Sequence, residues 1–194
     1  MTGIWQFVLY ALLAVGSLLT GSYVILAVIR GFQLQVLEIQ LRRQVALKNY
    51  PSALVTLQKT FRLNPSHTEI YFQRAKIYAA LGDFTSAEAD FTAGLRFNRN
   101  APAYAGRAAA RLALGRPSEA LVDANHVIAC SRVWWRGYYE RGRAYNALGY
   151  FEIALEDFDQ ALHLNRQTQA GILAARSEAA AQLNQDDKTF NNKI

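Results

Sequence analysis

The stretch AALGDFTSAEADFTAGL at residues 79–95 decides the fold, because variants of it recur downstream. LALGRPSEALVDANHVI occupies residues 112–128 and NALGYFEIALEDFDQAL residues 146–162, so the Leu-Gly pair returns after 33 and then 34 residues. A less regular copy, LKNYPSALVTLQKTFRLNP, precedes them at residues 47–65. Recurrence with this period predicts a solenoid built from stacked helical repeats.

Each copy predicts two helices joined at its glycine. Apolar residues recur three or four positions apart on both sides of Gly82, which is the spacing of one helix face. A small residue where two helices cross allows their backbones to approach closely. We therefore expect small residues of the first helix to face alanines of the second, in the pairs Ala75 with Ala87, Ala108 with Ala120 and Gly142 with Ala154.

The charges divide the chain into two parts. All 21 Lys+Arg and 15 Asp+Glu lie at or after Arg30, and residues 4–29 form an uncharged run of 26 residues. A helix of about 20 apolar residues crosses a bilayer. A cleaved signal peptide is the alternative, but no Lys or Arg precedes the run and no small-residue cleavage site follows it. Residues 4–29 therefore predict a membrane-spanning helix in contact with the lipid bilayer.

The distribution of basic residues predicts the orientation of this span. Arg30, Arg42, Arg43 and Lys48 follow it against the single Glu38, and nothing positive precedes it. Positive residues stay on the cytoplasmic side of a membrane. We expect a single-pass membrane protein with its N-terminus outside and its repeats in the cytoplasm or the stromal or other organellar equivalent.

The period and the recurring small and aromatic positions resemble the tetratricopeptide repeat family. The fourth copy carries the pattern most fully, at Tyr138, Gly142, Tyr145, Gly149, Ala154, Phe158 and Ala161. The resemblance implies an all-α fold, a helical-hairpin solenoid of about four repeats that follows the transmembrane helix. The expected parts are an anchor at 1–32, a degenerate first repeat continuous with the anchor at 33–67, three repeats within 68–166 (68–100, 101–134 and 135–166), a capping helix at 167–184 and a polar tail at 185–194.

Opposite charges recur in step within the copies. An arginine stands eight residues before each Leu-Gly glycine, and an aspartate follows sixteen residues after that arginine, in the pairs Arg74 with Asp90, Arg107 with Asp123 and Arg141 with Asp157. A basic ladder for an acidic ligand is one interpretation. A matched opposite charge at a constant offset favours structural pairs between the two helices of one repeat.

The resemblance also suggests where a partner binds. Chaperone-binding members of the family use a carboxylate clamp whose five positions fall here on Phe72, Lys76, Gly106, Arg136 and Glu140. Only Arg136 keeps the required chemistry, so recognition of a heat-shock chaperone tail is disfavoured. The remaining cations and aromatic residues of the expected concave groove predict a site for an extended peptide or a partner helix, at Phe72, Lys76, Arg136, Tyr139, Arg143 and Asn146.

Three further residues complete the predicted site. Arg143 is not one of the arginines that stand eight residues before a Leu-Gly glycine, so we expect it to be a freer charge than Arg141. Trp134 and Trp135 open the fourth copy. We expect one of them to pack at the repeat junction and the other to be a possible partner anchor.

The sequence predicts no enzyme. His67, His126 and His163 lie in different copies, no metal-ligand pair shares a helix face, and neither a P-loop nor a dinucleotide-binding glycine turn occurs. We expect no catalytic residue, cofactor or metal site.

Two functions from different classes remain. The layout resembles that of membrane-anchored scaffolds or adaptors that bind proteins and assist assembly or stability of a membrane complex, such as those of photosynthesis or respiration. The alternative is a membrane receptor for chaperones or client proteins. An RNA-binding helical repeat is a third reading, disfavoured by the apolar block and by the nearly balanced charges of each repeat, so we expect no nucleic acid partner.

Overall fold

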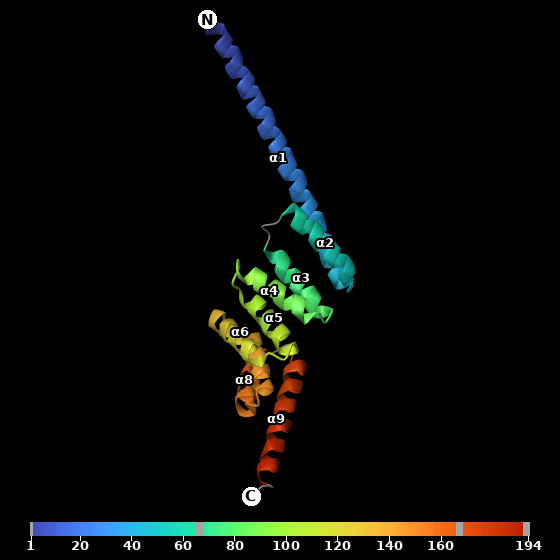
Figure 1. The fold of residues 1–194 in the computed structure, drawn as a ribbon, viewed down its shortest axis with the longest axis vertical. Helices are drawn as coiled ribbons and strands as arrows, with labels where there is room; N and C mark the ends of the chain where they lie inside the picture. The colour runs from blue at the N-terminus through green and yellow to red at the C-terminus, as the bar shows by residue number, and fades with distance from the viewer. Residues whose placement is uncertain (1, 65–67, 166–168, 192–194) are drawn as a thin grey trace. The chain divides into compact units, whose positions relative to one another are not determined.

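The structure, a computed structural model, describes the backbone of residues 2–64, 68–165 and 169–191 and the side chains from Tyr23 onward, except Asp186, Asp187 and most residues beyond them. All regular secondary structure in these residues is α-helical (Figure 1), which confirms the predicted fold class. The chain forms two compact units, residues 1–67 and 68–194. The helices are α1 (Thr2–Ala46), α2 (Tyr50–Leu63), α3 (Glu69–Ala80), α4 (Phe84–Leu95), α5 (Ala101–Ala113), α6 (Pro117–Cys130), α7 (Trp135–Ala147), α8 (Phe151–Leu164) and α9 (Ala170–Asn191).

The first unit is a hairpin of one long helix and one short helix. Figure 1 shows α1 running without a break from the N-terminal residues to its packing against α2. The stretch Tyr23–Ala46 is long and apolar enough to cross a membrane by length and composition. Most of the predicted span at 4–29 lies outside the described side chains; within it, the apolar side chains from Tyr23 to Ile29 are exposed.

The turn between α1 and α2 follows the same geometry as the later turns but without a glycine. The amide of Asn49 donates to the carbonyl of Gln44 at 2.8 Å, and Lys48 has a φ of 55°. In the second unit the equivalent left-handed positions are occupied by Gly82, Gly115 and Gly149, with φ of 81°, 71° and 83°. Lys48 therefore holds a backbone conformation that is unfavourable for a residue with a Cβ.

The second unit is a solenoid of three helical hairpins and a final helix. α3 contacts α5, α5 contacts α7 and α7 contacts α9, while α4, α6 and α8 pack between them on the other side. Because successive odd-numbered helices contact one another and successive even-numbered helices hardly do, the odd-numbered helices form the inner layer. The predicted small-residue crossings are buried: Ala75, Ala87, Ala108, Ala120 and Ala154 are all 0% exposed.

The capping helix is longer than the sequence predicts. α9 begins at Ala170 and continues to Asn191, through residues assigned above to a polar tail. The predicted end rests on the loss of apolar periodicity near residue 185. No glycine or proline occurs there to stop the helix, so it continues on polar residues alone.

Candidate functional site on the inner face of α7

Four of the predicted partner-binding residues lie on one face of α7. Arg136, Tyr139, Arg143 and Asn146 follow one another at intervals of three or four residues, which places them in one row along the helix. The row belongs to the inner layer, because α7 contacts both α5 and α9. The helix ends at Ala147 and is followed by the left-handed Gly149, after which the amide of Tyr150 donates to the carbonyl of Tyr145 at 3.0 Å.

A buried carboxylate lies within this row. Glu140 is 0% exposed, Arg143 Nη1 donates to its Oε2 at 2.9 Å, and Arg136 Nε lies 3.5 Å from its Oε1. The expectation that Arg143 is a freer charge is therefore wrong. Asp159 stands sixteen residues after Arg143 but bonds to Arg176, whereas the partner of Arg143 lies three residues earlier on the same helix.

The environment of Glu140 opposes its ionisation. Burial raises the pKa of the Glu140 carboxyl above its ordinary value, although the neighbouring Arg143 and Arg136 guanidinium groups act to lower it. Two buried oxygens, Glu140 Oε1 and Asn146 Oδ1, have no hydrogen-bond partner in the described part of the chain. Buried polar atoms in proteins are nearly always bonded. The row thus presents two partly exposed guanidinium groups above two buried oxygens that lack a hydrogen bond among the described residues.

Aromatic contacts hold Tyr139, a member of this row, against the hydrophobic core. The ring of Tyr139 lies 5.9 Å from that of Trp135 and 6.2 Å from that of the fully buried Phe158. The Arg143 guanidinium lies 5.6 Å from the Tyr139 ring centroid, a cation–π geometry. These tilted ring contacts and the cation–π contact restrict the Tyr139 and Arg143 side chains that a partner would meet.

Both tryptophans are half-buried. Trp134 packs against the core cluster that contains Phe72 and Phe91, and Trp135 packs against the cluster that contains Phe158. Each therefore joins a different hydrophobic cluster. A role for either as a partner anchor stays a prediction.

Phe72 does not belong to an exposed groove. It is 3% exposed, and a Cβ at Gly94 would lie 2.3 Å from its Cε1 atom. The ring therefore fills the space above a glycine of the facing helix, so the prediction of a surface anchor is wrong. Lys76 is exposed, and it borders a cavity of about 210 Å³ between α3 and α5 whose wall includes Phe72. The predicted set is thus divided between α3 and α7.

The middle position of the carboxylate clamp is closed by packing. A Cβ at Gly106 would lie 2.3 Å from Phe91 Cζ, and Phe91 is 2% exposed. An asparagine at position 106 would displace this ring. The clamp residue is thus absent for a steric reason as well as a chemical one.

The repeated arginines and aspartates meet in the structure. In each pair, Nε and Nη2 of the arginine donate to the two carboxylate oxygens, with shortest distances of 2.6, 2.7 and 2.7 Å for Arg74 with Asp90, Arg107 with Asp123 and Arg141 with Asp157. The hydrogen bond to Asp157 raises the pKa of Arg141, despite partial burial that acts in the opposite direction. Fork geometry of this kind is the strongest form of the interaction.

Each paired arginine also contacts other groups that the sequence did not indicate. The guanidinium carbons lie 5.6–5.8 Å from the ring centroids of the tyrosines three residues earlier, Tyr71, Tyr104 and Tyr138. Arg107 donates to Thr92 and Arg141 to Asn125, both on the preceding hairpin. All three arginines are therefore engaged within their own repeat, and Arg107 and Arg141 also bond to the preceding one. The sequence does carry a signal for the ring contacts, because a tyrosine stands three residues before each of these arginines, on the same helix face.

The third copy has a different network at its aromatic position. Arg111 stands where Tyr78 and Tyr145 stand in the neighbouring copies, and it pairs with Glu88 and with the fully buried Asp123, each at 2.9 Å. An ion network thus replaces an aromatic contact.

Within the described residues, no group of three or more His, Cys, Asp or Glu side chains is placed to hold a metal ion.

Comparison with known proteins supports the repeat assignment. The tetratricopeptide repeat family matches residues 68–100 and 136–168, which are the second and fourth copies. The third copy, with its substituted aromatic position, is not among the matched segments. No curated protein matches the sequence.

Solved structures with a similar fold include three of different origin. A MamA double mutant is 19% identical with a TM-score of 0.64, over 83% of this chain and 96% of that one. The TPR domain of Arabidopsis OM64 is 25% identical with a TM-score of 0.54, over 58% and 93%. The first TPR of Spaghetti (RPAP3), bound to the HSP90 peptide SRMEEVD, is 23% identical with a TM-score of 0.56, over 60% and 95%. These likenesses show a tetratricopeptide-like solenoid.

Proposed function

We propose, taking this tetratricopeptide-like solenoid as the premise, that the protein is a membrane-anchored scaffold that binds another protein along the inner face of α7. Repeats of this fold indicate protein interaction in general. The finer proposal is that the partner belongs to a membrane protein complex, such as a photosynthetic or respiratory one, whose assembly or stability the scaffold assists.

The observation that carries the proposal is the polar row on α7. Two unused buried acceptors, on Glu140 and Asn146, lie in the same row as the partly exposed guanidinium groups of Arg136 and Arg143. An extended segment that offers a carboxylate or other acceptors to the exposed parts of the two guanidinium groups would add charge-assisted hydrogen bonds to this row.

Membrane anchoring is supported by the first unit. Tyr23–Ala46 is apolar and long enough to span a bilayer, and the exposed side chains from Tyr23 to Ile29 have no polar group except the tyrosine hydroxyl. Because Arg30, Arg42, Arg43 and Lys48 all follow the uncharged run at 4–29, which is the proposed span, the positive-inside rule favours an outer N-terminus and cytoplasmic or stromal repeats. A scaffold tethered in this way encounters subunits of membrane complexes more often than an untethered, soluble scaffold would.

A receptor for chaperones or client proteins is the second candidate. It is favoured by the fold neighbour that is bound to an HSP90 peptide. Against it stand the closed position at Gly106 and the buried, arginine-paired Glu140, where the clamp requires donors for a terminal carboxylate. We therefore place the assembly role first.

The experiment is purification of the full chain from its native membranes in mild detergent, with bound proteins identified by mass spectrometry. Arg136→Gln is compared with Arg132→Gln, which removes the same charge from an exposed residue in the loop before α7. The proposal expects integral membrane subunits that bind the wild type and Arg132→Gln but are lost at least tenfold with Arg136→Gln. A soluble chaperone lost in the same way would favour the receptor. Equal retention by both variants would remove α7 as the binding surface.

A further inference from the structure

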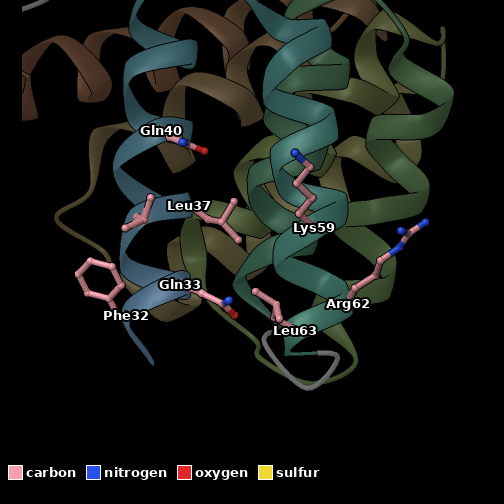
Figure 2. Close-up of a pocket in the computed structure, with 8 residues that line it drawn as sticks. Phe32, Gln33, Leu37, Gln40, Lys59, Arg62 and Leu63 are labelled. Carbon is pink, nitrogen blue, oxygen red and sulfur yellow. The ribbon is translucent and has the colours of Figure 1, made fainter. Parts of the chain in front are cut away.

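A groove lies between α1 and α2 within the first unit. Its volume is about 510 Å³, and Figure 2 shows Gln33, Leu37 and Gln40 projecting from α1 toward α2. Leu63 lies on the opposite wall, and Val36 completes the apolar floor. The groove has no part in the partner-binding row on α7.

The charged residues that line the groove are all basic. Lys59 and Arg62 border it, and no acidic residue does. In Figure 2 the Lys59 ammonium group extends on the side of α2 that faces α1, whereas the Arg62 guanidinium turns outward. Lys59 also lines an adjoining pocket together with Arg43. The groove and its rim therefore have the charge that an anion requires.

The basic excess is specific to this unit. Residues 1–67 contain six Lys+Arg and one Asp+Glu, whereas residues 68–194 contain fifteen and fourteen. The single carboxylate, Glu38, bonds to Arg42 at 2.6 Å. Lys59 and Arg62 have no acidic partner among the described residues. The first unit thus carries almost the whole formal charge of +6.

The groove begins where the uncharged run ends. Phe32, one of its lining residues, is two positions beyond Arg30, the first charge of the chain. At about 1.5 Å per residue, the segment from Phe32 to Gln40 covers about 3–15 Å of helix beyond that charge. The headgroup layer on each side of a bilayer is about 5–8 Å thick. The membrane-proximal part of the groove would therefore lie among lipid headgroups.

We propose that this groove binds an anionic phospholipid partly lifted out of the surrounding leaflet, with the phosphate at Lys59, beyond the headgroup layer, and the upper acyl segment along Val36, Leu37 and Leu63. The inference rests on the proposed membrane anchoring. Arg62 and Arg43, at the rim, add to the attraction for the negative headgroup. Clusters of basic residues directly after a span attract anionic lipids in this way. A zwitterionic lipid lacks the net charge that this rim selects.

The test uses the full chain in mild detergent, mixed with phosphatidylglycerol or phosphatidylcholine, and counts bound lipid by native mass spectrometry. The double variant Lys59→Gln/Arg62→Gln removes both lining cations. Arg96→Gln/Arg99→Gln is the matched control, because it removes two exposed arginines from the second unit. Val36→Trp fills the apolar floor without changing the charge. All five of these residues are exposed, and circular dichroism verifies that each variant is folded.

We expect the wild type to prefer phosphatidylglycerol. Since each basic residue near the headgroups contributes about fivefold, the Lys59/Arg62 variant should bind about thirtyfold more weakly and the Arg96/Arg99 control within twofold of the wild type. Val36→Trp should lower retention severalfold, which diffuse surface attraction would not. Equal binding of the two lipids, equal losses in both double variants, or a lipid-free dimer formed through this face would overturn the proposal. Alkaline extraction of native membranes tests the membrane anchoring separately. A chain that stays in the membrane but shows no lipid selectivity would overturn the lipid-binding groove and leave the proposed anchoring intact.

Discussion

Replacing Gly106 by alanine is expected to destabilise the second unit, although alanine favours helix. The new Cβ would lie 2.3 Å from Phe91 Cζ, about 1 Å closer than real contacts allow. Phe91 is 2% exposed within a core cluster, and its ring must shift toward the cavity of about 210 Å³ that it borders to admit the Cβ. Overpacking of this kind costs about 1–3 kcal/mol, and the helix propensity of alanine offsets at most about 1 kcal/mol. The expected net loss is about 1–2 kcal/mol.

Thermal unfolding of the full chain in mild detergent measures this loss, as a fall in Tm of about 2–8 °C. Gly171→Ala is the matched control, because a Cβ there meets nothing within 4 Å. The same substitution at position 171 should leave Tm unchanged or raise it slightly. A Tm for Gly106→Ala that equals or exceeds that of Gly171→Ala would refute the close packing of Phe91 on α5. It would also mean that position 106 has room for the asparagine of a carboxylate clamp.

Three other substitutions test separate parts of the structure. Arg141→Ala should lower the free energy of unfolding by about 1–3 kcal/mol, since it leaves Asp157 (6% side-chain exposure) without its fork; additive effects with Asp157→Ala in a double-mutant cycle would contradict the pair. Lys48→Gly should stabilise the α1–α2 hairpin by about 0.5–1 kcal/mol, because it relieves a φ of 55° at an exposed position, and faster proteolysis of that hairpin would argue against this. Burial raises the pKa of Glu140 in the folded state, so its contribution to stability is fully present below the unfolded pKa and is lost as pH rises through the folded pKa. Thermal melts from pH 4 to pH 8 should show this decline in Tm for the wild type and not for Glu140→Gln. Identical profiles of Tm against pH for the two proteins would exclude the pKa shift.

The features that the sequence predicts are those encoded by regular spacing. The repeat period sets the helix pairs, and an offset of sixteen residues joins facing positions of two antiparallel helices. The sequence alone therefore predicts the pair of Arg74 with Asp90. The capping helix follows from the same periodicity, but its end does not, because polar residues without glycine or proline permit helix without requiring it.

The features that the sequence does not predict depend on a neighbour at no fixed offset. Phe72 is buried because Gly94, on another helix, leaves room for its ring. Arg143 is paired with Glu140 on the same helix, whereas Asp159 on the next helix bonds to Arg176. Lys48 occupies a glycine position because its backbone bonds are those of the later turns. In each case the local pattern is compatible with two environments, and packing selects one.

Site-specific photocrosslinking in native membranes tests the central claim most directly. A photoreactive residue at Ala147, an exposed position on the same face of α7 as Arg143, is compared with one at Val122, which is 56% exposed on α6 in the other layer. The account predicts a discrete adduct between the full chain and an integral membrane protein from position 147 and none from position 122. An adduct from position 122 alone, or no adduct with a membrane protein from position 147, would contradict it.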